Sequence, residues 1–181
     1  MKRRRWVLGS VAMAAAAAGL AWRLNAERGQ DLQTAGPGAD AGARAADLWS
    51  MRFAQPGGGE LVMASLRGQP LLLNFWGSWC PPCIKEMPDL DHFARQHAAN
   101  GWRVVGLAVD NPQAVRDFLA RSPVSYTIGL AGFEGSELAR QLGNTQGALP
   151  YTVVFNRQGA MVQQKTGPAD AEELARWVDL I

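Results

Sequence analysis

Cysteine, histidine and charged residues are scarce in this sequence, and each scarcity excludes a class of protein. Only two of the 181 residues are cysteines and two are histidines. Two cysteines cannot form a multi-bridge disulfide scaffold, and two thiols alone cannot complete a four-ligand structural zinc site. Charged residues make up 19% and hydrophobic residues 48% of the chain. A chain of this length and composition buries a core, so wholesale disorder is excluded and one domain with an additional segment is expected.

Acidic residues are absent from the start of the chain, and this changes the meaning of the net charge of +2. Of the 18 Lys and Arg residues, five lie within residues 1–25, which leaves 13 against 16 Asp and Glu and a net charge of −3 for the rest. The main part of the chain is therefore mildly acidic. A phosphate-binding surface has no support, and no nucleic-acid partner is expected.

Residues 1–24 have the layout of an export signal. The basic block Lys2–Arg5 precedes an uncharged, mostly apolar run from Trp6 to Trp22, which is near the lower limit of about 17 residues that can span a bilayer. We interpret the segment as an uncleaved signal-anchor with the basic block in the cytoplasm. A signal peptide cleaved after Ala21 remains the alternative.

The rest of the chain divides into a tether and one α/β domain. Residues 25–46 are rich in Ala, Gly, Asp and Gln without apolar periodicity, which predicts a flexible linker. Within residues 47–181, alternation over 49–53, a Gly-rich turn and a return at 60–64 predict a β-hairpin. Apolar runs and helical periodicity predict strands at 70–76, 102–109, 126–130, 151–155 and 160–165, and helices from Cys80 to about 99, at 112–121, at 136–142 and from Asp170 to Ile181. This order predicts a mixed sheet flanked by helices.

Both cysteines lie in one Cys-Pro-Pro-Cys unit, Cys80 to Cys83, after a predicted buried strand and at the start of a predicted helix. Unpaired N–H groups and the positive end of the helix dipole favour a thiolate there and lower the pKa of the first thiol. Pro81 and Pro82 fix φ and stiffen the motif. We predict that Cys80 attacks a partner disulfide as a thiolate and that Cys83 resolves the mixed disulfide.

Three other uses of the pair are less compatible with the sequence. A c-type haem attachment requires His after the second cysteine, where Ile84 stands. A metal site needs further ligands, but His92 and His97 are five residues apart on the predicted helix, where we expect both at the surface. No metal and no cofactor are therefore expected. A purely structural disulfide of this span would close a tiny loop and stabilise little.

The stretch from Gly68 to Pro88, which contains Asn74, the cysteine pair and Glu86, closely resembles the TlpA/ResA/CcmG-like thiol–disulfide oxidoreductases of the thioredoxin superfamily. The likeness extends from about Leu48 to the C-terminus. The resemblance implies a thioredoxin-like mixed β-sheet flanked by helices, with an N-terminal β-hairpin and a helix–strand insertion at about 111–130. The anchor and tether also fit this family.

The resemblance implies roles for further residues. Leu149 and Pro150 occupy the place of a cis-proline loop that faces the cysteines and leaves backbone free to pair with a substrate chain. Asn74 stands where cytoplasmic thioredoxins carry a buried Asp. A partly buried Glu86 would have a raised pKa and assist proton transfer involving Cys83, and the alternative is an exposed helix residue.

Roles in contact, packing or capping are expected for other side chains near the motif. Trp79 is expected to shield the sulfurs and, with Pro81, Pro82, Leu149 and Pro150, to form the substrate-binding surface. Trp76 is expected in the core. Asp110, at the end of a predicted strand, is expected to cap the helix that begins at Pro112, and the alternative is that it lines a groove.

Taken with the resemblance, these features lead us to expect a membrane-tethered, periplasm-facing reductase of envelope protein disulfides, such as those of apocytochromes c or metal-centre assembly proteins. Its expected partners are those proteins, a membrane thiol reductant or oxidant, and the bacterial inner membrane. Two alternatives stay open. One is a dithiol oxidase, because direction depends on reduction potential. The other is a copper- or haem-delivery module that uses the thiols as ligands.

Overall fold

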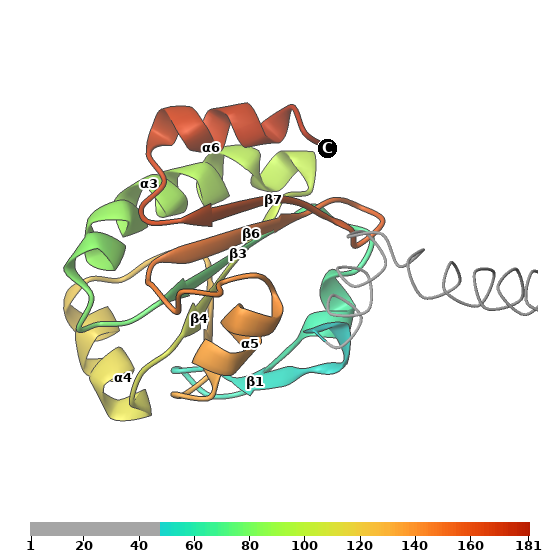
Figure 1. The fold of residues 1–181 in the computed structure, drawn as a ribbon. Helices are drawn as coiled ribbons and strands as arrows, with labels where there is room; N and C mark the ends of the chain where they lie inside the picture. Colours follow the sequence, from blue (N-terminus) through green and yellow to red (C-terminus); the bar gives the residue numbers. More distant parts are fainter. Residues whose placement is uncertain (1–47) are drawn as a thin grey trace, which may run out of the picture. The chain divides into compact units, whose positions relative to one another are not determined.

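The computed structural model describes residues 48–181, in which helices cover both faces of a seven-stranded sheet (Figure 1). The expected anchor at 1–24 and tether at 25–46 lie outside the described residues. No helix within 48–181 is long and apolar enough to cross a membrane. The strands are β1 (Arg52–Ala54), β2 (Glu60–Val62), β3 (Leu71–Trp76), β4 (Arg103–Ala108), β5 (Thr127–Leu130), β6 (Tyr151–Phe155) and β7 (Met161–Thr166). The helices are α3 (Pro81–His97), α4 (Pro112–Arg121), α5 (Gly135–Gln141) and α6 (Ala171–Val178), with 3-10 turns η1 (Met63–Leu66) and η2 (Ala98–Asn100).

The sheet has the strand order β2-β1-β5-β4-β3-β6-β7. Strands β3, β4 and β5 are parallel, and α3 and α4 supply the long crossovers that parallel strands require. Strands β6 and β7 continue one side of the sheet in antiparallel fashion, and the hairpin of β1 and β2 completes the other. The predicted mixed sheet, hairpin and helix–strand insertion (α4 and β5) are confirmed.

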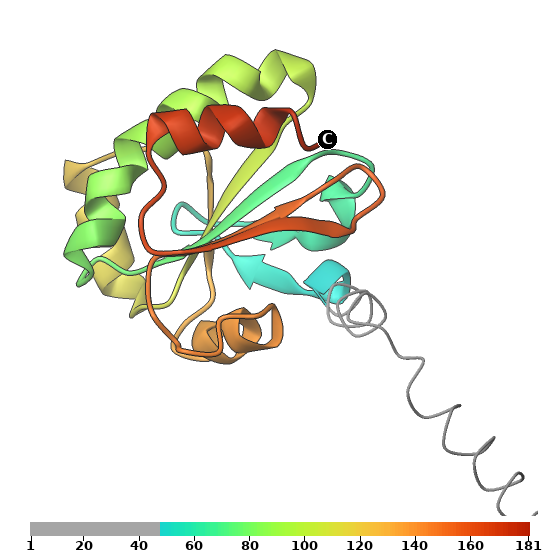
Figure 2. The same cartoon turned by 45° about the horizontal axis from the view of Figure 1, so that its top comes forward.

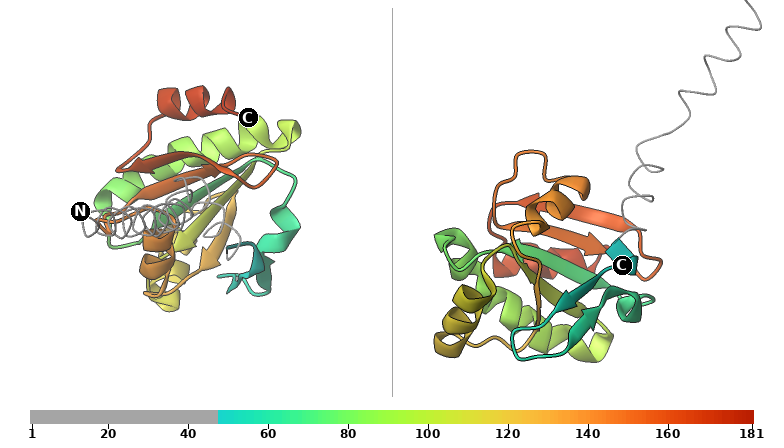
Figure 3. Two further views of the ribbon diagram at one scale, coloured as in Figure 1. Left: turned by 45° about the vertical axis from the view of Figure 1, so that its right-hand side comes forward. Right: turned by 90° about the horizontal axis from the view of Figure 1, so that it is seen from below.

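Strand β3 lies between β4 and β6, and all its residues are buried because both faces of the sheet are covered. Helices α3 and α6 lie over one face and α5 over the other (Figure 2, Figure 3). Successive side chains of a strand point to opposite faces. Leu72 and Trp76 therefore join the core cluster under α3, α4 and α6, whereas Leu71, Leu73 and Phe75 join the cluster under α5.

Trp76 is a core residue, as expected. It is fully buried, and its ring centroid lies 5.5 Å from that of Phe118 on α4. The ring passes over Gly106 of β4, where an added Cβ would lie 2.8 Å from Ile128 and 3.0 Å from Nε1 of Trp76. A side chain at position 106 would therefore collide with Ile128 and Trp76, which explains the glycine there.

The predicted strand at 49–53 is wrong at its beginning. Residues 48–50 are helical, and β1 begins at Arg52. Leu48 and Trp49 are both buried in the cluster under α5, and the Trp49 ring packs edge-on against Phe155. Two consecutive side chains on one side require a helical turn, because a strand would send them to opposite faces.

Two further expectations need correction. His92 is exposed as expected, but His97 is half-buried, with Nδ1 inaccessible and its ring 4.6 Å from that of Phe93 one turn earlier. Helix α6 ends at Val178 rather than Ile181, because Trp177 is its last buried side chain, Val178 is half-buried and residues 179–181 are exposed. Within residues 48–181 there is no group of three or more His, Cys, Asp or Glu that could hold a metal ion.

Candidate active site

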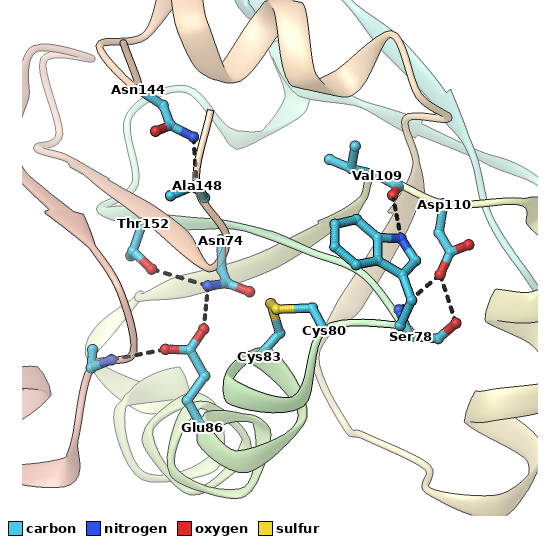
Figure 4. The surroundings of a disulfide bond; sticks show 12 residues. Asn74, Ser78, Cys80, Cys83, Glu86, Val109, Asp110, Asn144, Ala148 and Thr152 are labelled. Carbon is cyan, nitrogen blue, oxygen red and sulfur yellow. Dashed lines mark hydrogen bonds between the residues drawn. A yellow bond between two sulfur atoms is a disulfide. The ribbon is translucent and has the colours of Figure 1, made fainter. Parts of the chain in front are cut away.

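A disulfide between Cys80 and Cys83 lies where β3 leads into α3 (Figure 4). The sulfur atoms are 2.05 Å apart and the Cα atoms 5.3 Å apart. Cys80 is the residue before the first helical position and is 4% exposed, whereas Cys83 in the first turn is completely buried. An incoming disulfide therefore meets Cys80 first, which favours Cys80 as the attacking sulfur.

The two prolines limit the hydrogen bonds that Cys80 can accept. A side chain at its position normally accepts from the N–H of the second or third helical residue. Pro82 is the second and has no N–H, so the N–H of Cys83 alone remains for this role. A Cys80 thiolate is thus stabilised by one backbone N–H and the helix dipole. Pro81 and Pro82 are both exposed, as a surface that contacts substrate requires.

Glu86 lies on the buried face of α3, one helical turn after Cys83 (Figure 4). The residue is 2% exposed. Its Oε1 accepts a hydrogen bond from Nδ2 of Asn74 at 2.8 Å, and its Oε2 accepts one from the backbone N–H of Ala169 at 2.8 Å. The expectation of a buried carboxyl is confirmed, and the alternative of an exposed helix residue is wrong.

Burial raises the pKa of Glu86 to about 7, because the ionised carboxylate is removed from water. The hydrogen bonds from Ala169 and Asn74 favour the charged form and lower the pKa, but they offset only part of the effect of burial. A carboxyl with a pKa near neutrality can both accept and release a proton at physiological pH. Glu86 is therefore suited to proton transfer near the disulfide.

Asn74 holds Glu86 from the centre of the sheet. Its Nδ2 also donates to Oγ1 of Thr152 on β6, at 3.0 Å. Asn74 is fully buried, and its Oδ1 has no hydrogen-bond partner among the described residues. Figure 4 shows this oxygen pointing toward the disulfide. Because an amide does not titrate, Asn74 orients the carboxyl without adding a second charge to the site.

Asp110 ties the end of β4 to the loop that leads into Cys80. Its Oδ2 accepts from the backbone N–H and the hydroxyl of Ser78, at 2.8 and 2.6 Å, and its Oδ1 accepts from the N–H of Asn111. The expected capping role is wrong, because Asn111 caps α4 by accepting from Gln113. The carboxyl ends of parallel β3 and β4 meet at one edge of the sheet, and this brings Asp110 to Ser78.

Asp110→Asn is expected to destabilise the protein by about 1–3 kcal/mol, because a partly buried donor loses its charged acceptor. An asparagine has one acceptor oxygen, so its NH₂ must face either the Ser78 donors or the Asn111 N–H. Denaturant unfolding measures the loss, and the rate of exchange with a small disulfide reports whether the loop before Cys80 has moved.

Asp117→Asn is the matched control for this substitution. Asp117 is exposed on α4 and accepts from Gln113. Its replacement is expected to change the unfolding free energy by less than about 0.5 kcal/mol. Equal effects of the two substitutions would contradict the structural role given to Asp110.

Trp79 is exposed but fixed in position. Its Nε1 donates to the backbone oxygen of Val109 at 3.2 Å, and the ring lies over Gly77, where a Cβ would come within 2.7 Å of Nε1. The residue is nevertheless 58% exposed. Trp79 therefore presents a rigid apolar surface beside Cys80, as the expected contact with substrate requires.

The peptide bond between Leu149 and Pro150 is cis, as the family resemblance implies. Buried Asn144 holds the preceding loop: its Nδ2 donates to the oxygen of Ala148 at 2.8 Å, and its own backbone oxygen accepts from Gly147 at 3.1 Å. Pro150 is buried, and Leu149 packs against the core cluster that contains both cysteines. The loop expected to bind substrate backbone thus lies against the surroundings of the disulfide.

Ser78, Asn144 and Thr152 are site residues that the sequence reasoning missed. Thr152 had a signal, since it is the one polar residue in the otherwise apolar strand β6. Asn144 had only its position after the glycine that ends α5. The partner of Ser78 could not be inferred, because 32 residues separate it from Asp110.

Comparison with known proteins gives consistent results. The family model described as Redoxin matches residues 42–179. The sporulation thiol-disulfide oxidoreductase A of Bacillus subtilis (strain 168) is 30% identical over 125 residues, which cover 67% of this chain and 73% of that protein. The thiol-disulfide oxidoreductase ResA of Bacillus thuringiensis (strain Al Hakam) is 27% identical over 125 residues, 68% of this chain and 70% of that protein.

Solved structures with the same fold include two that are at least 27% identical to this chain. StoA from Bacillus subtilis aligns with a TM-score of 0.58 at 27% identity, over 71% of this chain and 95% of that one. A thioredoxin-related protein from Neisseria meningitidis serogroup B aligns with a TM-score of 0.63 at 31% identity, over 71% and 96%. Residues 42–179, which the Redoxin model matches, contain the disulfide, Glu86 and the cis-proline loop. The chain therefore belongs to the Redoxin family and is a thiol–disulfide oxidoreductase of the ResA/StoA type with a thioredoxin-like fold.

Proposed function

We propose that this protein reduces disulfides of bacterial envelope proteins, held at the inner membrane by residues 1–24 with residues 47–181 in the periplasm. Apocytochromes c and metal-centre assembly proteins are the proposed substrates, and a membrane thiol reductant regenerates the dithiol. The observation that carries the proposal is the Cys80–Cys83 disulfide beside the buried carboxyl of Glu86. The basic and then apolar order of residues 2–22 supports the location.

The reaction proceeds in two exchanges. The Cys80 thiolate attacks one sulfur of the partner disulfide, so a Cys80–partner bond forms, the partner S–S bond breaks, and the released thiolate takes a proton from water. Cys83 then gives its proton to the Glu86 carboxylate and attacks Cys80. The intramolecular disulfide forms, the second partner thiolate leaves, and two electrons have passed to the partner.

Asn74 connects the two groups that exchange the proton. Its Nδ2 fixes Oε1 of Glu86. Its Oδ1 is unpaired in the disulfide form and is available to accept a hydrogen bond from the Cys83 thiol after reduction. Because the amide carries no charge, it positions the carboxyl next to the thiol without competing for the proton.

The prolines support reduction as the net direction. A dithiol whose thiolate is strongly stabilised is a strong oxidant, because the reduced form is then favoured. Here the N–H of Cys83 is the only one that the helix start offers to Cys80. The reduced form is therefore less stabilised and gives up its electrons more readily, which favours a reductase over a dithiol oxidase.

Cys83→Ser tests the proposal in cells. The variant retains the attacking sulfur but cannot resolve the mixed disulfide, so envelope proteins with paired cysteines are expected to accumulate as dithiothreitol-sensitive adducts in the membrane fraction. Mass spectrometry identifies the partners, and non-reducing electrophoresis measures the adducts.

The double variant Cys80→Ser/Cys83→Ser is the control and is expected to form no adduct. Adducts confined to cytoplasmic proteins would contradict the proposed location. Wild-type protein that stands fully oxidised in growing cells would contradict the proposed direction and favour the oxidase alternative.

A further inference from the structure

Two exposed aromatic residues line one hollow near the disulfide. Among residues 48–181, the large apolar side chains that are exposed belong to Trp79, Phe133, Leu180 and Ile181, and the last two end the chain. Trp79 is 58% and Phe133 68% exposed. The hollow has a volume of about 210 Å³, and no charged residue lines it. It is lined by Trp79, Val109, Phe133, Ser136, Ala139, Asn144, Gly147 and Leu149.

Hydrogen bonds fix the Trp79 ring and the backbone that carries Phe133. The Trp79 indole is fixed by its hydrogen bond to Val109. The turn that carries Phe133 is closed by a bond from the N–H of Gly135 to the oxygen of Ala131, and both the N–H and the hydroxyl of Ser136 donate to the oxygen of Phe133. Apolar surface that is held exposed in this way typically marks an interaction site, and a rigid site loses little entropy on binding.

The hollow is continuous with the surface through which the disulfide reacts. Trp79 directly precedes Cys80, and Leu149 packs against the cluster that contains both cysteines. Cys80 itself is only 4% exposed. A polypeptide that brings a disulfide to Cys80 therefore lies against the side chains around this residue, and Trp79 and Leu149 among them also line the hollow.

The size and polarity of the hollow indicate which kind of group it binds. Small-molecule sites usually enclose about 300–1,000 Å³, so a hollow of about 210 Å³ suits a single side chain. In protein interfaces, individual large apolar side chains commonly fill pockets of this kind and carry much of the binding energy. The uncharged lining would leave an acidic or basic side chain without a partner.

From these observations we infer that the hollow is a docking subsite for one large apolar side chain of the polypeptide substrate, close to the cysteine that Cys80 attacks, and that Phe133 sets this preference. The inference rests on the proposed action on protein disulfides and adds a substrate class. Substrates with leucine, methionine or phenylalanine near the reactive cysteine are preferred over substrates with small polar or charged residues there.

A series of disulfide-bonded peptides tests the inference. Four positions are varied one at a time, the two before and the two after the cysteine, and each carries either leucine or serine. At one of these positions, reduction by wild-type protein is expected to favour leucine by about tenfold in kcat/KM, mainly through KM. In Phe133→Ala, this preference is expected to fall to less than twofold.

Leu180→Ala is the matched control, because Leu180 is an exposed apolar residue beyond α6, on the opposite face of the sheet from α5. It is expected to keep both the rate and the leucine preference. Circular dichroism verifies that each variant is folded. Equal use of leucine and serine peptides by wild-type protein at every position, or an unchanged preference in Phe133→Ala, would overturn the docking subsite. Failure of wild-type protein to reduce any peptide, while it still reduces a small aromatic disulfide, would instead overturn the proposed action on polypeptides.

Discussion

Cys80→Ser is expected to abolish disulfide exchange, lowering the rate of reduction of a protein disulfide by on the order of 10³-fold or more. The hydroxyl of serine does not ionise at neutral pH and cannot form a mixed disulfide. Cys83 cannot take over the attack, because it is completely buried in the first turn of α3 and an incoming disulfide has no access to it.

The matched variant is Cys83→Ser, which changes the same atoms three residues away. With an aromatic disulfide that releases a coloured thiolate, reduced wild-type protein is expected to release two equivalents. Cys83→Ser is expected to release one and keep the other half bound, and Cys80→Ser none on the same timescale. Absorbance and intact mass measure both quantities. Equal modification of the two variants would contradict the assignment of Cys80 as the attacking sulfur.

Glu86→Gln is expected to slow the second exchange by about 10²-fold at neutral pH, a typical contribution of a proton-transfer group. Glutamine keeps the size of the side chain, and the Asn74 amide can turn to accept from its NH₂. It cannot accept the proton that Cys83 must lose. The rate of resolution of a preformed mixed disulfide, followed between pH 5 and 9, is the measurement. Glu172→Gln, at an exposed position on α6, is the control and is expected to match wild-type protein.

The same carboxyl makes the stability of the disulfide form depend on pH. Its pKa is about 7 in the folded protein against 4.5 without burial, so the folded state holds the proton more tightly. The contribution of Glu86 to the unfolding free energy is therefore largest below pH 4.5. This contribution falls as the pH rises from 4.5 to about 7, and it does not change further at higher pH. At about 1.4 kcal/mol per pKa unit, the total loss is on the order of 3 kcal/mol.

Glu86→Gln is expected to lack this loss. Urea unfolding of the two oxidised proteins at pH 5 and pH 8 measures the difference, and the variant should gain stability relative to wild-type protein as the pH rises. Parallel changes in the two proteins would show that Glu86 does not bind a proton in this range.

Local patterns predicted most of the fold because each core strand and helix carries its own signal. The apolar run at 71–76 had to be buried on both faces, and Pro112 marked the first turn of α4. The error at Trp49 arose because a few alternating apolar residues fit a strand and a helical turn equally well. Tertiary packing of Leu48 and Trp49 on the same side decided between them.

The site was predicted only in part. The spacing of the two cysteines identifies the redox-active pair. The burial of Glu86 could be predicted as well, because Glu86 lies on the same face of the helix as Cys83 and Leu90. Burial raises its pKa, and the hydrogen bonds that offset part of this come from far along the chain, since Asn74 is 12 and Ala169 is 83 residues away. Asp110 was misassigned for the same reason. A capping role is visible in neighbouring residues, whereas a bond to Ser78 depends on which strand ends meet.

The way the N-terminal hairpin joins the sheet has a consequence for how the protein opens. Strand β1 is paired with β5 only through Ala54 and Leu130, whereas β3 is paired along its whole length with β4 and nearly so with β6. Cooperative units that differ in this way open with different free energies. We therefore expect the amide protons of the hairpin to exchange with solvent before those of Asn74 and its neighbours, and hydrogen-exchange measurements would show this order.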